Sequence, residues 1–137
     1  DERGICPDGF HVPSDEEWNT LAILLDPSTS QDYFGIVSLI AGGMLKETGT
    51  IEEGDGYWYE PNEGATNETG FSARGAGFRN GNSTGLYLYM GSSLYYWTTT
   101  ALGEDDIIYW RLGFSNGKLI RQHWYGSSGN SIRCIQD

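Results

Sequence analysis

The pattern of apolar and polar residues predicts one clear helix near the start of the chain. Ser14 and Glu17 form a capping-box pair, in which each side chain accepts a hydrogen bond from the other residue's backbone, so a helix is expected to begin just after Ser14. Pro27 ends this helix, because proline cannot continue it. Apolar residues recur at helical spacing between these limits and predict a buried face: Trp18, Leu21, Ala22 and Leu25.

A second apolar stretch covers residues 33–45. It is hydrophobic nearly all round, which predicts a central helix packed against a sheet. Gly42 and Gly43 either weaken the end of this helix or allow another backbone segment to come close.

The rest of the chain predicts loops and strands. From Thr48 onward, Gly, Asn, Ser and Thr separate short aromatic runs, which is typical of turns. Residues 108–114 then alternate between apolar and other side chains, and Asn116-Gly117 predicts a hairpin turn to a partner strand over residues 118–124. A further turn leads to a closing strand at residues 131–135. Helices followed by strands indicate an α+β fold, and the length predicts one domain over residues 1–137.

Composition and charge narrow the classes of function. The 137 residues contain 8 Lys and Arg against 19 Asp and Glu, so the net charge is −11. We therefore expect neither nucleic acid nor an anionic membrane as a partner, because both require a concentrated basic face. No run of about 18 apolar residues predicts a membrane-spanning helix. The first residues form no hydrophobic signal core, as expected of a mature or excised domain.

The two cysteines, Cys6 and Cys134, lie at opposite ends of the sequence. Their spacing matches no zinc-ligand pattern. The two interpretations are a disulfide that closes nearly the whole chain and a catalytic thiol, and we favour the disulfide. Such a bridge is worth about 4–5 kcal/mol in the chain-entropy model. It predicts an oxidising compartment, namely the periplasm, the cell surface or the extracellular space.

Five sequence blocks occur in a recognisable order: CPDGFHVPSDEEW (6–18), AGGMLK (41–46), NETGFSA with GFRN (67–73 and 77–80), YWTTT (96–100) and SIRCI (131–135). Together they resemble the signature blocks of the Fibrobacter succinogenes major paralogous domain family over essentially the whole chain. The resemblance implies a C-type lectin-like fold, shared with formylglycine-generating enzymes and with the variable proteins of diversity-generating retroelements. That fold has two helices in the first third, an antiparallel β-sheet with long irregular loops, and adjacent chain termini. The family occurs mostly on exported and surface proteins of Bacteroidetes-like bacteria.

The resemblance does not imply the chemistry of formylglycine-generating enzymes. Those enzymes use two cysteines close together in the C-terminal half, where this chain has only Cys134. No nucleophile elbow, phosphate loop or dinucleotide fingerprint is present either. His11 is expected to hold a turn, and His123 to be exposed on a strand. We therefore expect no enzymatic activity.

Acidic residues cluster at 52–55 and 104–106 without EF-hand spacing, as solvated acidic loops do. Glu60-Pro61-Asn62 copies a tripeptide of calcium-dependent mannose-type lectins. The partner strand of those lectins carries Trp-Asn-Asp, whereas Thr98-Thr99 follow Trp97 here and supply no carboxylate or amide. We therefore expect no cofactor, with calcium as the ion to test.

The aromatic residues divide into core and surface groups. Three tryptophans are expected in the core: Trp18, Trp97 and Trp110. Four tyrosines fall on polar sides of strands or in loops: Tyr57, Tyr59, Tyr109 and Tyr125. Arg111, Arg121 and His123 share strand phase with Tyr109 and Tyr125, which predicts a mixed aromatic and basic ligand-binding patch. The resemblance to the retroelement variable proteins, whose ligand-facing residues lie in the C-terminal strands, implies a ligand-facing region at residues 109–125. The alternative is that these tyrosines merely cover the sheet.

Three functions follow from these expectations. The first is a secreted or surface-exposed bacterial binding module that recognises a glycan or a surface protein without covalent chemistry. The second is a structural subunit of a surface fibre or layer, whose partners are copies of itself. The third is an enzyme that diverged from the formylglycine-generating type, which requires a free thiol.

Overall fold

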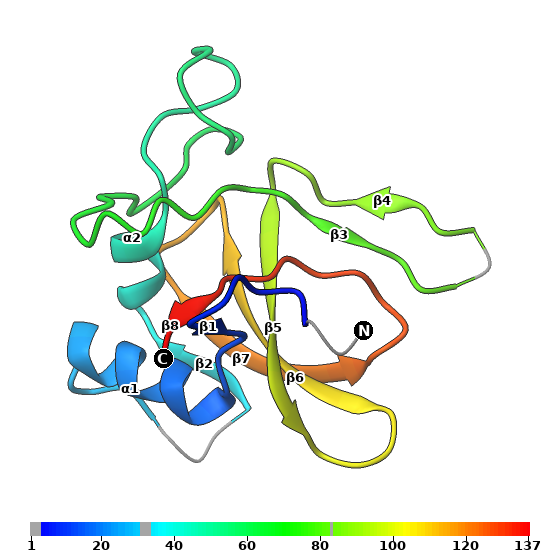
Figure 1. The fold of residues 1–137 in the computed structure, drawn as a ribbon. Helices are drawn as coiled ribbons and strands as arrows, with labels where there is room; N and C mark the ends of the chain where they lie inside the picture. Colours follow the sequence, from blue (N-terminus) through cyan, green and yellow to red (C-terminus); the bar gives the residue numbers. More distant parts are fainter. Residues whose placement is uncertain (1–3, 31–33, 83) are drawn as a thin grey trace.

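The computed structural model describes residues 4–30, 34–82 and 84–137, and it has an α+β architecture with antiparallel sheets (Figure 1). Tyr33, with which the second predicted helix begins, lies outside the described residues. In chain order the elements are β1 (Phe10–His11), α1 (Asp15–Leu25), β2 (Gly35–Ser38), α2 (Ala41–Leu45), β3 (Phe78–Arg79), β4 (Tyr87–Leu88), β5 (Ser93–Ala101), β6 (Asp106–Gly113), β7 (Leu119–Tyr125) and β8 (Ile135–Gln136).

Helix α1 forms as its sequence predicts. The Glu17 amide donates to Ser14 Oγ at 3.2 Å, and the Ser14 amide donates to Glu17 Oε2 at 2.8 Å, so the capping box is complete. The helix ends at Leu25, where the Asp26 amide donates to the Ala22 carbonyl. Trp18 and Ala22 are buried, and Leu21 and Leu25 pack against the same core.

The helix predicted over residues 33–45 is wrong in its first half. Residues Gly35–Ser38 form strand β2, and only Ala41–Leu45 are helical. Ile36 and Val37 are β-branched and favour a strand, in which Val37 is buried and Ile36 is exposed. A short run that is apolar all round does not distinguish a buried helix from a strand, which is why periodicity failed here.

The two glycines of α2 allow other segments of the backbone to pack directly against the helix. A Cβ atom at Gly42 would lie 2.1 Å from the Lys118 carbonyl oxygen, and one at Gly43 would lie 2.1 Å from the Gly64 carbonyl oxygen. Side chains are therefore excluded at both positions. Of the two interpretations drawn from the sequence, close approach is the correct one.

The main sheet has the strand order β2-β7-β6-β5, and all its neighbours are antiparallel. The predicted hairpin joins β6 to β7, but β6 ends at Gly113 and β7 begins at Leu119, so the connection is longer than a two-residue Asn116-Gly117 turn. The closing strand predicted at residues 131–135 is shorter, since only Ile135–Gln136 form β8 and Ser131 makes an isolated bridge to Tyr96. Both helices lie on one side of this sheet, and β3 and β4 project from the molecule as an arm (Figure 1).

Strand alternation divides the main sheet into two faces. The inner face carries Leu94, Tyr96, Trp110 and Leu112 and packs against α1 through a stacked Trp18–Trp110 pair, with ring centroids 5.8 Å apart. The outer face carries Tyr95, Trp97, Tyr109 and Arg111. Trp97 is therefore not a core residue as expected, because it lies on the opposite face from Tyr96 and is only partly buried.

Segments near the two ends of the chain, around Cys6 to His11 and Cys134 to Gln136, lie side by side. Strands β1 and β8 pair, and Cys6 and Cys134 form a disulfide with Cα atoms 5.8 Å apart. The predicted bridge is thus present, and it is compatible with an oxidising compartment. Within the described residues, no helix is long and apolar enough to cross a membrane.

Candidate ligand-binding site

The predicted aromatic and basic patch is split between the two faces of the sheet. Residues that oppose each other in adjacent strands point to the same face, and Tyr109 opposes Gln122 while Trp110 opposes Arg121. Tyr109 and Arg111 therefore lie on the outer face, whereas Arg121 lies on the inner face. The expectation of one continuous patch is wrong.

Arg121 and His123 are held by other side chains of the protein. The Arg121 guanidinium forms a buried ion pair with Asp15, and its Nε donates to Asp15 Oδ1 at 2.8 Å. His123 Nδ1 lies 3.3 Å from Asp106 Oδ2, and its ring contacts the ring of Phe34 edge-on. Arg121 is thus mostly buried, and its guanidinium is bound to Asp15 rather than open to a ligand.

The remaining predicted tyrosines lie apart from Tyr109. Tyr57 stacks against the Arg74 guanidinium at 4.5 Å, and Tyr59 meets the Phe114 ring edge-on at 6.4 Å between centroids. Tyr125 is exposed and opposes Asp106 at the end of the sheet, where it lines a hollow with Glu104 and Asp105. These tyrosines do not form one surface with Tyr109.

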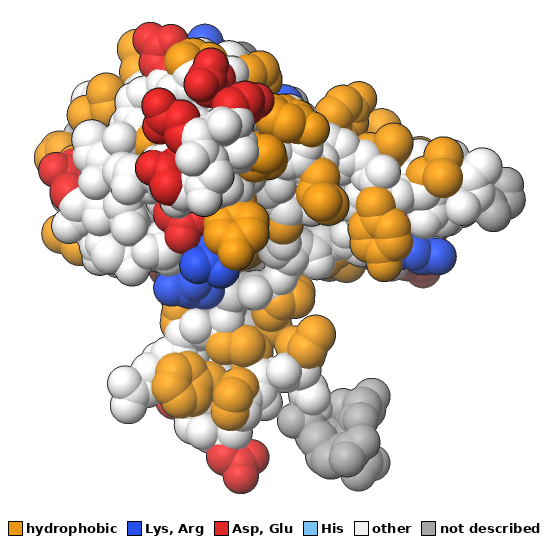
Figure 2. All heavy atoms as spheres, turned by 90° about the horizontal axis from the view of Figure 1, so that it is seen from above, with side chains coloured by type: hydrophobic (Ala, Val, Ile, Leu, Met, Phe, Trp, Pro, Cys, Tyr) orange, Lys and Arg blue, Asp and Glu red, His pale blue; other side chains and the backbone are white. Residues whose placement is uncertain are grey.

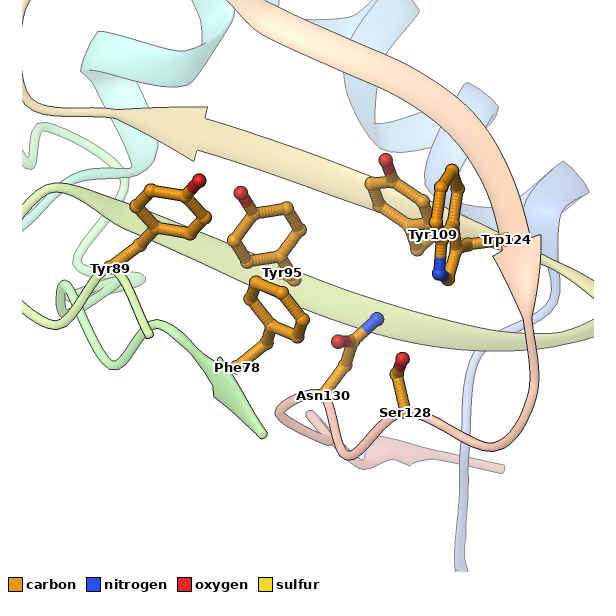
Figure 3. Close-up of a pocket in the computed structure, with 7 residues that line it drawn as sticks. All are labelled: Phe78, Tyr89, Tyr95, Tyr109, Trp124, Ser128 and Asn130. Atoms are coloured by element: carbon orange, nitrogen blue, oxygen red, sulfur yellow. The ribbon is translucent and has the colours of Figure 1, made fainter. Parts of the chain in front are cut away.

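A cavity of about 180 Å³ opens on the outer face of the sheet. We call it the aromatic cleft, and Figure 3 shows the residues that line it: Phe78, Tyr89, Tyr95, Tyr109, Trp124, Ser128 and Asn130. They come from strands β3, β5, β6 and β7, from the turn after β4, and from the segment that follows β7. Of these residues, only Tyr109 was predicted from the sequence to bind a ligand.

The floor of the aromatic cleft is a connected set of rings. Phe78 contacts Tyr95 at 5.1 Å between centroids, and Tyr95 contacts Tyr109 at 5.6 Å. Tyr109 is 8% exposed, and its hydroxyl donates to Gln122 Oε1 at 2.8 Å. Burial raises the pKa of Tyr109, so this hydroxyl stays protonated and keeps its donor role at neutral pH. The floor is thus fixed by packing and a hydrogen bond.

The rim of the aromatic cleft is exposed and partly strained. Trp124 is 56% exposed and Tyr89 58% exposed. Tyr89 has a φ of +61°, which costs a bulky side chain about 1–3 kcal/mol. The amides of Ser92 and Ser93 both donate to the Tyr89 carbonyl and hold this conformation. The strained backbone brings an aromatic ring to the cleft.

Two polar side chains complete the aromatic cleft. Gly129 exchanges two backbone hydrogen bonds with Arg79, at 2.7 and 2.8 Å, which fixes the segment that carries Ser128 and Asn130. Within the described part of the chain, the Ser128 hydroxyl and the Asn130 amide make no hydrogen bond to protein groups, and both point toward the rings in Figure 3. They remain available to a ligand.

The aromatic cleft is suited to stacking and hydrogen bonding. None of the described residues that line it is charged. Arg111 lies beside it, with its guanidinium 5.6 Å from the Tyr95 ring centroid and its Nη2 3.3 Å from Ser93 Oγ. The arrangement presents apolar ring faces with hydroxyl and amide groups at their edge.

The asparagine of the lectin-like tripeptide is buried and hydrogen-bonded to the backbone of the protein, whereas Glu60 and Pro61 are exposed. Asn62 is 6% exposed, and its Nδ2 donates to the carbonyls of Glu47 and Gly49, both at 2.9 Å. Among the residues that the structure describes, no group of three or more His, Cys, Asp or Glu side chains is placed to hold a metal ion.

Comparison with known proteins identifies a family. The model of the Fibrobacter succinogenes major domain matches residues 1–136. No curated protein and no solved structure matches the chain.

Proposed function

The chain belongs to the Fibrobacter succinogenes major domain family, and we propose that it is a non-enzymatic binding module that holds a glycan in the aromatic cleft. The family description names no activity or ligand, so the proposal rests on the cleft itself. We also propose a C-type lectin-like fold, which the paired termini, the two early helices and the long irregular middle support.

The proposal rests on one observation: five aromatic rings line the cleft together with two polar side chains that make no hydrogen bond to any described residue. A sugar ring has an apolar face and polar edges, and it matches ring faces bordered by Ser128 and Asn130. The volume of about 180 Å³ is below the usual range for small-molecule sites, so it suits one sugar ring. The absence of charge among the described lining residues favours a neutral saccharide.

The disulfide supports an exported location. Cys6 and Cys134 are bridged, as expected for a protein that matures in an oxidising compartment. We therefore propose that the module is secreted or displayed on a bacterial surface. No cysteine in the described residues is free, which removes the thiol that a formylglycine-type enzyme requires.

A glycan array on the purified chain tests this function, with calcium and again with a chelator. We expect binding to a neutral glycan that the chelator does not change, because Asn62 is committed to its own backbone. Loss of binding with the chelator would contradict the assigned site. The absence of binding to any glycan, both with calcium and with the chelator, would overturn the glycan proposal.

Two adjacent residues provide a matched pair for locating the site. Trp124 lines the aromatic cleft, whereas Tyr125 does not, and both are more than half exposed. We expect Trp124→Ala to weaken glycan binding at least about tenfold, by about 1.4 kcal/mol or more. Tyr125→Ala removes only an edge-on ring contact to Trp124, at 5.9 Å between centroids, and should change binding less than about twofold. Isothermal titration calorimetry measures both. Equal losses, or a loss only in Tyr125→Ala, would place the ligand elsewhere.

A second candidate function, self-association, is favoured by the projecting arm. Leu86, Tyr87 and Met90 on this arm are 58%, 74% and 68% exposed, and Figure 2 shows hydrophobic side chains along it. Exposed apolar patches are a feature of protein interfaces. Mass measurement at rising concentration distinguishes the two functions, since a binding module stays monomeric and a fibre subunit does not.

A further inference from the structure

A second hollow, of about 390 Å³, lies on the other side of β5 from the aromatic cleft. We call it the Arg133 hollow. It is bordered by the inner-face residues Leu94 and Tyr96 of β5, by residues 70–72, 74 and 76, and by residues 131–133. The aromatic cleft is bordered instead by Tyr95, which alternation places on the outer face. The two hollows are therefore separate sites.

The Arg133 hollow is basic on a protein of net charge −11. Arg133 and Arg74 line it, and none of its described lining residues is Asp or Glu. Arg74 already binds Glu47 Oε1, with Nη2 at 3.1 Å. The Arg133 guanidinium lies 4.4 Å from the Phe71 ring centroid and forms no ion pair within the described part of the chain. Arg133 therefore supplies the uncompensated positive charge.

Side chains with hydroxyl groups line the same hollow as this charge. Tyr96 is 6% exposed, its ring is fixed against Trp18 at 5.4 Å, and its hydroxyl makes no hydrogen bond to any described residue. Burial raises the pKa of Tyr96, so its hydroxyl stays protonated, and Tyr96 and Arg133 border the same hollow. A protonated hydroxyl beside a guanidinium is a donor pair for an anion.

Two serines complete the set of donors. Ser131 is held to β5 by two backbone hydrogen bonds, to Tyr95 and from Trp97. Ser72 has a φ of +54°, and its Oγ accepts from Asn67 Nδ2 at 2.9 Å, which leaves the hydroxyl hydrogen to be donated. Both residues line the same hollow.

We infer that the Arg133 hollow binds the carboxylate of a small organic acid, such as a uronic acid. A planar guanidinium matches a planar carboxylate, and the hydroxyls of Tyr96 and Ser131 supply further donors. The high negative charge of the whole chain disfavours anions that carry more than one charge, phosphate included. This site is independent of the glycan proposed for the aromatic cleft.

Titration by NMR and calorimetry tests the inference, with sodium glucuronate, sodium acetate, glucose and inorganic phosphate as probes. We expect glucuronate to shift the amide signals of residues 131–133 and Ser72, phosphate to bind more weakly, and glucose to leave these signals unmoved. If acetate binds as tightly as glucuronate, the site is one for simple carboxylates. If glucuronate binds more tightly than acetate, the site is one for acidic sugars. Absence of shifts with both carboxylates, or an equal response to glucose or phosphate, would overturn the proposal.

Three variants locate the binding group. Arg133→Gln should weaken carboxylate binding at least about tenfold, and Tyr96→Phe, which keeps the packed ring, about threefold to tenfold. Arg79→Gln removes the same charge from an exposed position on β3 outside the hollow, and it should change binding less than about twofold. Equal effects of Arg133→Gln and Arg79→Gln would overturn the site. Trp124→Ala should leave carboxylate binding intact, which separates this result from the fate of the glycan proposal.

Discussion

At the residue scale, the Asp15 carboxylate joins the first helix to the sheet. It accepts from Trp110 Nε1 at 3.0 Å and from Arg121 Nε at 2.8 Å, and the side chains of Arg121 and Asp15 are 12% and 8% exposed. Removing one partner of a buried ion pair leaves the other charge uncompensated. The pair therefore fixes how α1 sits on β6 and β7.

Replacing this carboxylate should be costly. We expect Asp15→Asn to lower the free energy of unfolding by about 3–5 kcal/mol, because Arg121 remains buried without its counter-charge. The neighbour Glu16 is exposed on the same helix turn, so Glu16→Gln should cost less than about 1 kcal/mol. Urea unfolding of both variants measures the difference, and equal losses would contradict the structural role assigned to Asp15.

His11 makes stability depend on pH. Its Nδ1 lies 2.7 Å from Asp137 Oδ1 and its Nε2 2.9 Å from Glu17 Oε1, and these hydrogen bonds raise the pKa of His11 above its ordinary value. A group whose pKa is raised by folding stabilises the folded state fully below its unfolded pKa of about 6.5. That stabilisation is lost as the pH rises through the folded pKa.

The melting temperature should show this loss. We expect wild type to be more stable than His11→Gln at about pH 5.5, where His11 is protonated in both the folded and the unfolded protein. This advantage should shrink as the pH rises through the raised pKa of the folded state. Scanning calorimetry of both proteins across this range provides the measurement. Two melting curves that stay parallel with pH would show that the ion pairs of His11 do not contribute.

At the element scale, the sequence predicts helix α1 correctly but predicts a helix where strand β2 lies, and the two outcomes have different physical causes. The capping box of Ser14 and Glu17 is a local device, so its outcome depends on few other contacts. The identity of Gly35–Ser38 depends instead on pairing with β7, which lies more than 80 residues away in sequence, as the pair Ile36 and Ile120 shows (120 − 36 = 84). Tertiary pairing overrides a local pattern in such segments.

The sequence contains enough information to place Trp124, but not Arg121, on the same face of the sheet as Tyr109. A hairpin with a two-residue Asn116-Gly117 turn pairs odd-numbered residues of one strand with even-numbered residues of the next, and the register observed keeps this parity, with Tyr109 opposite Gln122. Trp124 therefore belongs with Tyr109, and Arg121 does not. Ser128, Asn130 and Phe78 come from irregular or very short segments, whose placement no periodicity predicts.

At Gly43 in helix α2, intrinsic helix propensity favours alanine, whereas packing against the neighbouring backbone excludes it. Alanine stabilises helices relative to glycine by about 1 kcal/mol, yet a Cβ at Gly43 would meet the Gly64 carbonyl oxygen at 2.1 Å. We expect Gly43→Ala to destabilise the protein by at least about 1–3 kcal/mol. Gly103→Ala, with nothing within 4 Å of its Cβ, should be nearly neutral. Chemical denaturation compares them, and a neutral Gly43→Ala would refute the close approach.

At the scale of the whole molecule, two short strands and one disulfide join the segment that begins at Cys6 to the last residues of the chain. Strands β1 and β8 have two residues each, and the Asp137 amide adds one hydrogen bond to the Gly9 carbonyl. The Cys6–Cys134 bridge spans 128 residues, so it restricts almost the whole unfolded chain. The sequence predicted this closure, because both cysteines lie near the termini and no metal-ligand spacing competes for them.

Removing the bridge should therefore affect stability and the C-terminal segment together. We expect a variant with both Cys6→Ser and Cys134→Ser to lose about 2–5 kcal/mol of unfolding free energy. Amide hydrogen exchange should rise most at residues 131–136. Without the disulfide, this segment is held to β5 mainly by the two backbone hydrogen bonds of Ser131. Exchange at the buried amides of Trp110 and Leu112 in the central strand should change only as far as global stability falls. A uniform rise across the chain, with no excess at residues 131–136, would show that the bridge acts on the unfolded state alone.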